Sequence, residues 1–171
     1  MKKLLLLRHA KSSWADPHMA DFDRPLNERG VAAAPFMGGI MSREQLIPDL
    51  ILSSHAERAR NTAELVRLGS RLEIEIRYDE RIYEASPQTL QRILIEADPH
   101  VTSLMIVGHN PGMEGLIRLL TGDSAEMPTA ALAEIDLKIQ EWKDVRPLAG
   151  DLVRVMRPKE RLKAEEDLTS T

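Results

Sequence analysis

Two histidines follow apolar runs that have the composition of buried strands. Arg8 and His9 come directly after residues 4–7, and His109 comes just after residues 104–107. An imidazole can attack phosphorus and carry the phosphoryl group, and a second imidazole can donate to phosphoryl oxygens as charge develops. A guanidinium offers those oxygens a planar fork that stays charged. These residue types predict phosphoryl chemistry, provided that the fold brings them together.

A second arginine arises from another part of the chain. Ser53 and Ser54 follow the apolar residues 50–52, and Arg58 lies near the start of the helical pattern that comes next. Ligands of open parallel sheets bind beyond the carboxyl ends of the strands. Three strand ends would then deliver two arginines and two histidines to one edge. A lone histidine is as often a hydrogen-bonded structural residue, so the convergence is what favours a site.

Apolar runs alternate with helical patterns along the chain. The runs cover residues 4–7, 50–52, 74–76 and 104–107, and the helical patterns cover residues 56–68, 87–97 and 113–120. Gly69 and Gly122 are expected to end the first and last of these helices. Residues 132–139 and 152–156 read as later strands, the first with one wetter face and antiparallel to the rest. The order predicts an α/β three-layer sandwich with a largely parallel central sheet flanked by helices.

Residues 27–46 fit this scheme less well. Their composition is helical, but Pro35 lies inside the segment and Gly38 and Gly39 follow. An interior proline removes a hydrogen bond and clashes with the preceding turn, at a cost of about 3 kcal/mol. We therefore expect a kinked helix or two short ones.

Composition narrows the class of protein. The 171 residues suit one domain, with 43% hydrophobic residues for its core. The net charge of −4 argues against a protein whose whole surface binds nucleic acid, but it does not exclude a local basic pocket. The absence of cysteine excludes disulfides, thiolate nucleophiles and cysteine-based zinc sites. The apolar run before Arg8 is shorter than the 7–15 residues of a signal peptide, and none approaches the ~20 of a membrane span. We expect a cytoplasmic protein with no nucleic-acid or membrane partner.

Three motifs then carry a specific resemblance. Residues 8–14, Arg-His-Ala-Lys-Ser-Ser-Trp, resemble the Arg-His-Gly motif that opens the histidine phosphatase superfamily, also called the phosphoglycerate mutase-like family. Residues 54–63 resemble its second motif, Ser-Pro-x-x-Arg-Ala-x-Gln-Thr-Ala, and Gly108–Gly112 resemble its Gly-His motif at a strand end. The order and strand contexts agree with the family, which implies a phosphoglycerate mutase-like fold.

The resemblance also implies roles for individual residues. His9 would be the phosphorylated nucleophile, and Arg8, Arg58 and His109 would complete the phosphate site. Ala10 stands where the family usually has glycine, a change that can adjust the loop without removing chemistry.

The general acid is less well marked. Many family members place a Glu or Asp in a loop to protonate the leaving oxygen. Glu84 is the first candidate, Asp21 and Asp23 are alternatives, and Glu84 is equally well read as a solvated loop carboxylate. Ser12 and Asn61 are candidate phosphate contacts.

Within the superfamily the chain resembles the short bacterial branch of SixA-type phosphohistidine phosphatases. The segments responsible are residues 23–30, 109–112 and 128–132. The resemblance predicts a histidine phosphatase domain over residues 1–158. The polar residues 159–171 would form a tail or loose helix.

The resemblance leaves several functions open. A protein that carries phosphohistidine is the first choice of substrate, because the short chain has little room for a lid over a small molecule. A small phosphomonoester and a non-catalytic phosphate-binding module are alternatives, and a mutase would need longer insertions. No cofactor or metal is expected: Asp16, His18, Asp21 and Asp23 share one loop, but loops are commonly acidic and the proposed chemistry needs no metal.

Overall fold

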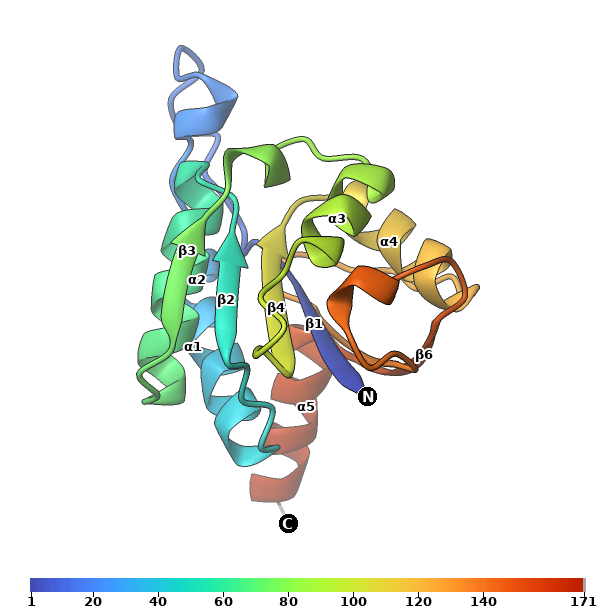
Figure 1. The fold of residues 1–171 in the computed structure, drawn as a ribbon. Coiled ribbons are helices and arrows are strands. Elements are labelled where there is room, and N and C mark those ends of the chain that lie inside the picture. The colour runs from blue at the N-terminus through green and yellow to red at the C-terminus, as the bar shows by residue number, and fades with distance from the viewer. Residues whose placement is uncertain (171) are drawn as a thin grey trace.

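A computed structural model describes residues 1–170 and contains one six-stranded sheet with the strand order β3-β2-β4-β1-β5-β6 (Figure 1). The strands are β1 (Lys2–Arg8), β2 (Leu50–Ser53), β3 (Glu75–Tyr78), β4 (Ser103–Gly108), β5 (Leu132–Leu137) and β6 (Gly150–Met156). The first four pair in parallel, and β5 runs antiparallel to both β1 and β6. The largely parallel α/β sandwich predicted from the sequence is confirmed.

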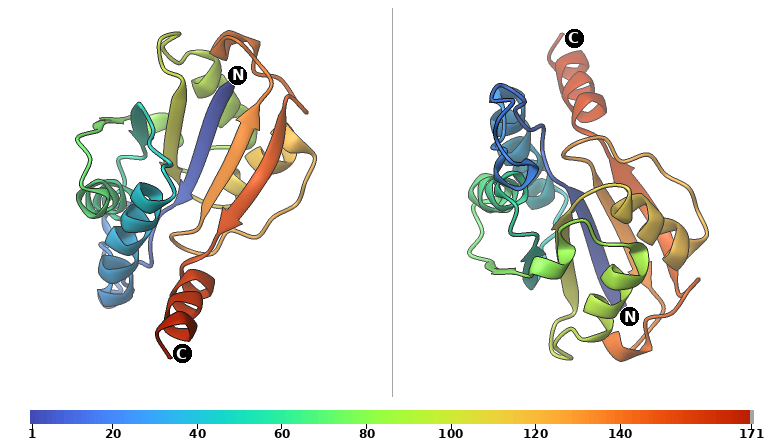
Figure 2. Two further views of the ribbon diagram at one scale, coloured as in Figure 1. Left: turned by 90° about the horizontal axis from the view of Figure 1, so that it is seen from below. Right: turned by 90° about the horizontal axis from the view of Figure 1, so that it is seen from above.

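Helices cover both faces of the sheet (Figures 1 and 2). They are α1 (Glu28–Arg43), α2 (Glu57–Ser70), α3 (Pro87–Ile95), α4 (Gly112–Thr121) and α5 (Pro158–Thr169), with short 3-10 turns at η1 (Asp21–Asp23), η2 (Glu80–Ile82) and η3 (Trp142–Asp144). Gly122 ends α4 with a φ of 80°, as expected for a left-handed cap.

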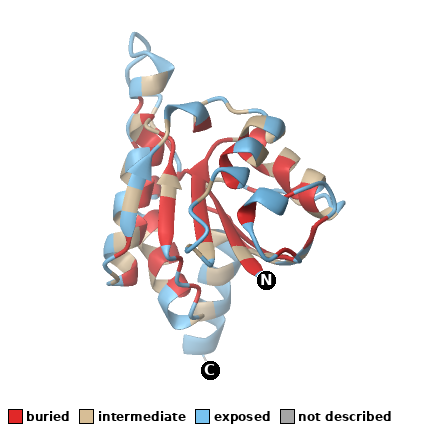
Figure 3. Ribbon diagram, in the orientation of Figure 1, coloured by how far each residue is buried: buried red, intermediate tan, exposed pale blue. Residues whose placement is uncertain are grey.

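Two hydrophobic clusters account for the continuous apolar run of β1. Leu4 and Leu6 face the cluster formed with α3 and α4, whereas Leu5 and Leu7 face the cluster formed with α1 and α2. All four leucines are fully buried (Figure 3). Because successive strand residues point to opposite faces, a strand covered on both sides must be apolar throughout. This burial fixes where β1 ends, and with it the position of the residues that follow.

Of the two outcomes expected at Pro35, the pair of short helices is wrong, because α1 continues as one helix across this residue. Close packing against α2 explains the outcome. A Cβ added to Gly69 would lie 2.1 Å from the carbonyl oxygen of Pro35, and one added to Gly38 would lie 2.2 Å from that of Val66. The two backbones are therefore in contact, and their packing offsets the local cost of proline. Gly69 is also not a helix stop, since α2 continues to Ser70.

The strand β5 has one apolar and one polar face, as the alternation of its residues predicted: Ala133, Ile135 and Leu137 are buried in the core, whereas Glu134 and the half-buried Asp136 lie on the other face. Glu134 is only 6% exposed, because it forms ion pairs with Lys3 on β1 and Arg154 on β6. The predicted tail contains α5, which is tied to the end of α1 by an ion pair between Arg161 and Glu44 (2.6 Å). No helix within residues 1–170 is long and apolar enough to cross a membrane.

Candidate active site

The register of the parallel strands brings three strand ends side by side. Arg8 on β1 pairs with Gly108 on β4, and Ser53 on β2 pairs with Val107. The pattern continues one residue further, where the amide of His9 donates to the carbonyl of Gly108 (3.0 Å). The imidazole rings of His9 and His109 therefore lie next to each other, with centroids 5.1 Å apart. The convergence at the sheet edge that was inferred from the sequence is present.

The ring of His9 is held in one orientation and one tautomer. It is 7% exposed, and its Nδ1 lies 2.7 Å from the carbonyl oxygen of Ala10. A carbonyl can only accept, so Nδ1 carries the hydrogen and Nε2 keeps its lone pair. Burial lowers the pKa of His9 to about 4, and the neighbouring Arg58, Arg8 and Arg24 lower it further in the same direction. At neutral pH the ring is uncharged and has a free nitrogen nucleophile.

The ring of His109 is also uncharged. Burial, together with the neighbouring His9 and Arg58, lowers its pKa to about 3. Its Nε2 lies 2.8 Å from the hydroxyl of Ser54, at the end of β2. When that hydroxyl donates, Nδ1 bears the hydrogen, and Nδ1 is buried without a hydrogen-bond partner. In that tautomer, one N–H of His109 is left for a ligand.

Arg8 and Arg58 each have a side-chain N–H group without a hydrogen-bond partner. Arg8 donates from Nη1 to the carbonyl of Met127 (3.0 Å), and Arg58 is buried at 6% exposure. Within residues 1–170, five buried side-chain polar atoms lack a partner, and three of them are Nε of Arg8, Nε of Arg58 and Nδ1 of His109. Buried donors without partners are uncommon in folded proteins. Their concentration around two neutral imidazoles fits a site for an anion.

A carboxylate already lies against one of these cations. Asp21, in η1, accepts from Arg58 at Oδ2 (3.0 Å), from the hydroxyl of Tyr83 (2.6 Å) and from Arg24 at Oδ1 (3.1 Å). These donors, with Tyr83 the largest influence, lower the pKa of Asp21 to about 2. Asp21 is therefore ionised at neutral pH. In this arrangement it holds no proton for a leaving group, and its role as an alternative general acid remains a prediction.

Glu84 lies beside the site without a contact to it. It follows Tyr83, whose ring centroid is 5.5 Å from that of His109, but its own side chain is exposed and forms no hydrogen bond or ion pair within the described residues. Its φ of 54° lies in the left-handed region, which residues with a side chain rarely adopt. Such backbone strain is often found at functional sites. The role of Glu84 as general acid remains a prediction.

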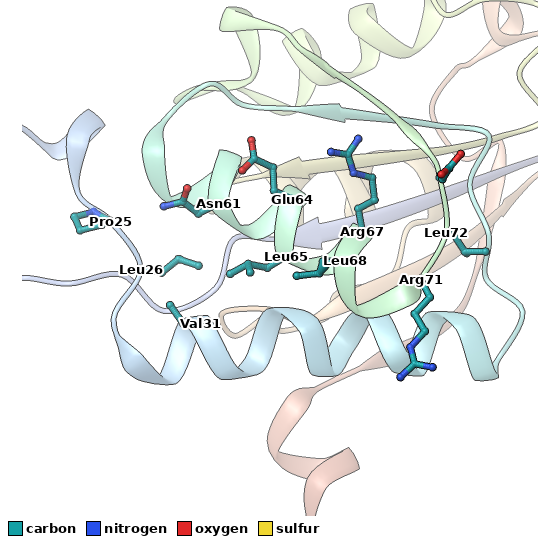
Figure 4. Close-up of a pocket in the computed structure, with 11 residues that line it drawn as sticks. Pro25, Leu26, Val31, Asn61, Glu64, Leu65, Arg67, Leu68, Arg71 and Leu72 are labelled. Atoms are coloured by element: carbon teal, nitrogen blue, oxygen red, sulfur yellow. The ribbon is translucent and has the colours of Figure 1, made fainter.

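Ser12 and Asn61 occupy different surroundings. Ser12 is buried, and its hydroxyl accepts from Arg24 (2.7 Å), so it reaches the site through that arginine. Asn61 donates to Glu57 (3.3 Å) and lines a groove along α2 (Figure 4). The structure gives Asn61 no contact with His9 or His109. The phosphate contacts predicted for both residues remain untested.

Other residues of the site carried weaker sequence signals. The hydroxyl of Thr62 accepts from the amide of Ala10 (2.9 Å) and donates to the carbonyl of Arg58 (2.7 Å). Thr62 lies one turn of helix after Arg58, and this spacing could have shown that both side chains face the same way. Ser54 follows a predicted strand and could have been assigned by its position. Within residues 1–170 no three His, Asp or Glu side chains gather as metal ligands.

Comparisons with known proteins agree with this geometry. The model of the histidine phosphatase superfamily (branch 1) matches residues 4–101. An uncharacterised protein of Mycobacterium tuberculosis is 34% identical over 158 residues, which cover 86% of this chain and 96% of the relative. A structure from Agrobacterium tumefaciens, provisionally named phosphohistidine phosphatase SixA, is 33% identical with a TM-score of 0.79, covering 92% of this chain and 98% of that one.

A further solved structure shares the fold at lower identity. It is the protein histidine phosphatase SixA complexed with tungstate, 20% identical with a TM-score of 0.76, covering 93% of this chain and 99% of that one. The family match spans more than half of the chain and includes the first two motifs of the site. The chain therefore belongs to the histidine phosphatase superfamily and is a phosphatase.

Proposed function

We propose that this phosphatase removes phosphoryl groups from phosphohistidine on proteins, through a covalent intermediate on His9. One observation carries the proposal. The hydrogen bond from Nδ1 of His9 to the carbonyl of Ala10 (2.7 Å) leaves Nε2 unprotonated within a group of unpaired donors. A module that only recognised phosphate would have no need of a free, uncharged nucleophile at that point.

The reaction has two steps. In the first, Nε2 of His9 attacks phosphorus, a P–N bond forms, and the bond from phosphorus to the leaving group breaks. In the second, water attacks the phosphohistidine, its proton is released, and His9 and inorganic phosphate are regenerated. Arg8 and Arg58 balance the charge on the equatorial oxygens, and the N–H of His109 donates to one of them. None of these groups has to change protonation state between the steps.

The supply of protons favours phosphohistidine over an alkyl phosphate. Asp21 is ionised, with a pKa of about 2, and Glu84 is exposed and held by no partner. An alkoxide is a poor leaving group and depends on a positioned acid, an effect typically worth about 10²–10⁴-fold. An imidazole leaves more readily and can take its proton from solvent. A site without an embedded acid therefore suits a P–N substrate.

A small phosphomonoester is the second candidate, and one observation favours it. The left-handed backbone at Glu84, with a φ of 54°, sets this carboxylate apart from an ordinary loop residue. If a substrate draws Glu84 into the site, a proton donor becomes available. The two candidates differ in whether turnover needs this residue.

A trapping experiment tests the proposed function. The protein is mixed briefly with a peptide whose single histidine has been phosphorylated by phosphoramidate, and the reaction is quenched in denaturant at alkaline pH. We expect acid-labile phosphate on His9 and no label in His9→Ala. Label on serine, or normal turnover by His9→Ala, would show that the mechanism is wrong. Turnover of aryl and alkyl phosphates without turnover of the phosphohistidine peptide would favour a small phosphomonoester as the substrate.

A further inference from the structure

A groove outside the catalytic cluster runs between the N-terminal half of α1 and the start of α5. It has a volume of about 760 Å³ and is bounded at one end by Lys11 and by the Pro128–Thr129 segment. Part of its lining is apolar, from Ala33 and Phe36 on α1 and Leu162 on α5. Leu162 is 49% exposed, which leaves apolar surface open beside charged side chains.

The groove is strongly biased in charge. Four cationic side chains line it, Lys11, Arg29, Arg157 and Lys159, against the single carboxylate of Glu160. Arg157 is paired, because it donates to the carbonyl of Glu126 (2.9 Å). The other three cations form no ion pair or side-chain hydrogen bond in the part of the chain that is described. In a protein of net charge −4, this is a local surplus of positive charge that attracts an anionic partner.

Both walls of the groove are fastened to the strand end that carries His9. On one side, the amide of Asn27, at the start of α1, donates to the carbonyl of Lys11 (3.0 Å). On the other, the amide of Ala130 donates to the carbonyls of Arg8 and His9 (both 3.1 Å). Lys11 itself lies two residues after His9. The groove therefore adjoins the segment that carries the nucleophile.

A second groove offers a useful contrast (Figure 4). It has a volume of about 630 Å³ and lies along α2, and its charged lining mixes Glu64 and Glu73 with Arg67 and Arg71. Mixed charge gives no preference for an anionic or a cationic partner. The size of the two grooves is similar, so charge rather than volume distinguishes the first one.

We propose that the groove between α1 and α5 binds an acidic segment of the phosphorylated protein, next to the histidine that is dephosphorylated. Aspartate or glutamate side chains of the segment pair with Lys11, Arg29 and Lys159, and an apolar side chain packs against Phe36 and Leu162. This inference rests on the proposed function, since it takes the substrate to be a protein. Contacts between the groove and the flanking chain would add affinity to that of the phosphoryl group. They would also let the protein distinguish one phosphorylated protein from another.

Direct binding tests the groove without any turnover. The probes are two fluorescent, unphosphorylated peptides of equal length, one rich in Asp and Glu with a central Leu, the other with Gln and Ser in place of the acids. We expect the acidic peptide alone to bind, with affinity falling as salt screens the charges. The double variant Arg29→Glu with Lys159→Glu should weaken binding at least about tenfold, equivalent to about 1.4 kcal/mol. The matched control, Arg71→Glu in the second groove, should leave binding unchanged.

Kinetics separates this inference from the proposed function. The double variant should raise KM for a histidine-phosphorylated acidic peptide and leave turnover of p-nitrophenyl phosphate unchanged, because that substrate does not reach the groove. Equal binding of both peptides, or unchanged binding of the acidic peptide by the double variant, would overturn the role proposed for the groove. Stronger competition by a short oligonucleotide than by the acidic peptide would also overturn it. If the acidic peptide binds but its phosphohistidine is not cleaved, the groove stands and the proposed function fails.

Discussion

The two sides of the site are built in different ways. Arg8 and the two imidazoles come from the ends of β1 and β4, and Arg58 from the first turn of α2 just after β2; these strands are largely buried and their register leaves little freedom. The carboxylate of Asp21 comes from an exposed loop, in which residues 14–21 are all exposed. The residues proposed to contact phosphate oxygens are thus held in place by the core. The loop that carries Asp21 can move away from them with little loss of buried surface.

This difference suggests an order of events. In the structure Asp21 accepts from Arg58, so one of the cations proposed to bind phosphate is paired with a carboxylate. An incoming phosphoryl group carries more charge than a carboxylate and can displace it. Arg58 would then keep its position, since it is 6% exposed, while the loop adjusts. On this view, the buried cations and imidazoles act on every substrate, and the loop residues only tune the site.

The largest effect is expected from Arg58→Ala. Arg58 is proposed to stabilise charge on the transferred phosphoryl group, which is common to all substrates. Loss of one such donor typically costs about 10²–10³-fold in kcat. We therefore expect a loss of this size for phosphohistidine, aryl and alkyl phosphates alike, measured under identical conditions. Arg60→Ala, on the exposed side of the same helix, is the matched control. A loss confined to one substrate class would contradict the assignment.

A selective effect is expected from Glu84→Gln. If Glu84 donates the proton, alkyl phosphate turnover should fall by about 10²-fold, the low end of the usual range for general acids, because the carboxylate is exposed. Aryl phosphate and phosphohistidine turnover should hardly change, because these groups leave without a positioned acid. The measurement is kcat/KM for the three substrates with the variant and the parent protein. Equal small losses on all three would return Glu84 to the role of a solvated loop residue.

Asp21→Asn should change affinity for phosphate by a few-fold only. The substitution keeps the shape of the side chain but removes the negative charge beside Arg58, and it leaves one acceptor oxygen where Arg24, Arg58 and Tyr83 now share two. We expect inorganic phosphate and tungstate to inhibit at lower concentration, since no carboxylate competes for the guanidinium. Asp16→Asn, elsewhere on the loop, is the control. Weaker inhibition in Asp21→Asn would show that Asp21 holds Arg58 in place rather than competing with phosphate.

The same contrast explains what the sequence could and could not predict. Arg8, His9 and His109 follow apolar runs directly, so their convergence follows from strand positions alone. The contacts of Asp21 with Arg58 and Tyr83 join residues 37 and 62 positions apart through a loop, and no local pattern predicts them. Pro35 is a second case in which a contact distant in sequence decides the structure. Local propensity predicts a break in the helix, but packing against α2, a contact distant in sequence, decides the outcome.

The smallest effect is expected from a change of pH near neutrality. The histidines and Asp21 all keep one protonation state there, although for different physical reasons. Burial lowers the pKa of His9 to about 4 and that of His109 to about 3, whereas hydrogen bonds from Tyr83 and Arg58 lower that of Asp21 to about 2. None of the three should therefore change charge between about pH 5 and 7. The unfolded chain takes up protons on both histidines as pH falls through about 6.5, and the folded chain does so only near 4 and 3. Their contribution to stability is thus complete above about pH 6.5 and decreases as pH falls towards 4.

Nitrogen NMR of protein labelled in its five histidines measures this directly. The signals of His9 and His109, assigned by their loss in His9→Ala and His109→Ala, should stay those of neutral rings at pH 5.5. The His9 signal should show hydrogen on Nδ1 and a free Nε2, as its bond to the carbonyl of Ala10 requires. Either ring becoming charged near pH 6.5 would mean that water reaches it, and that the strand-end half of the site is less closed than its burial indicates. An Nε2-protonated His9 would contradict the nucleophile itself, because the lone pair would then face the backbone instead of the substrate.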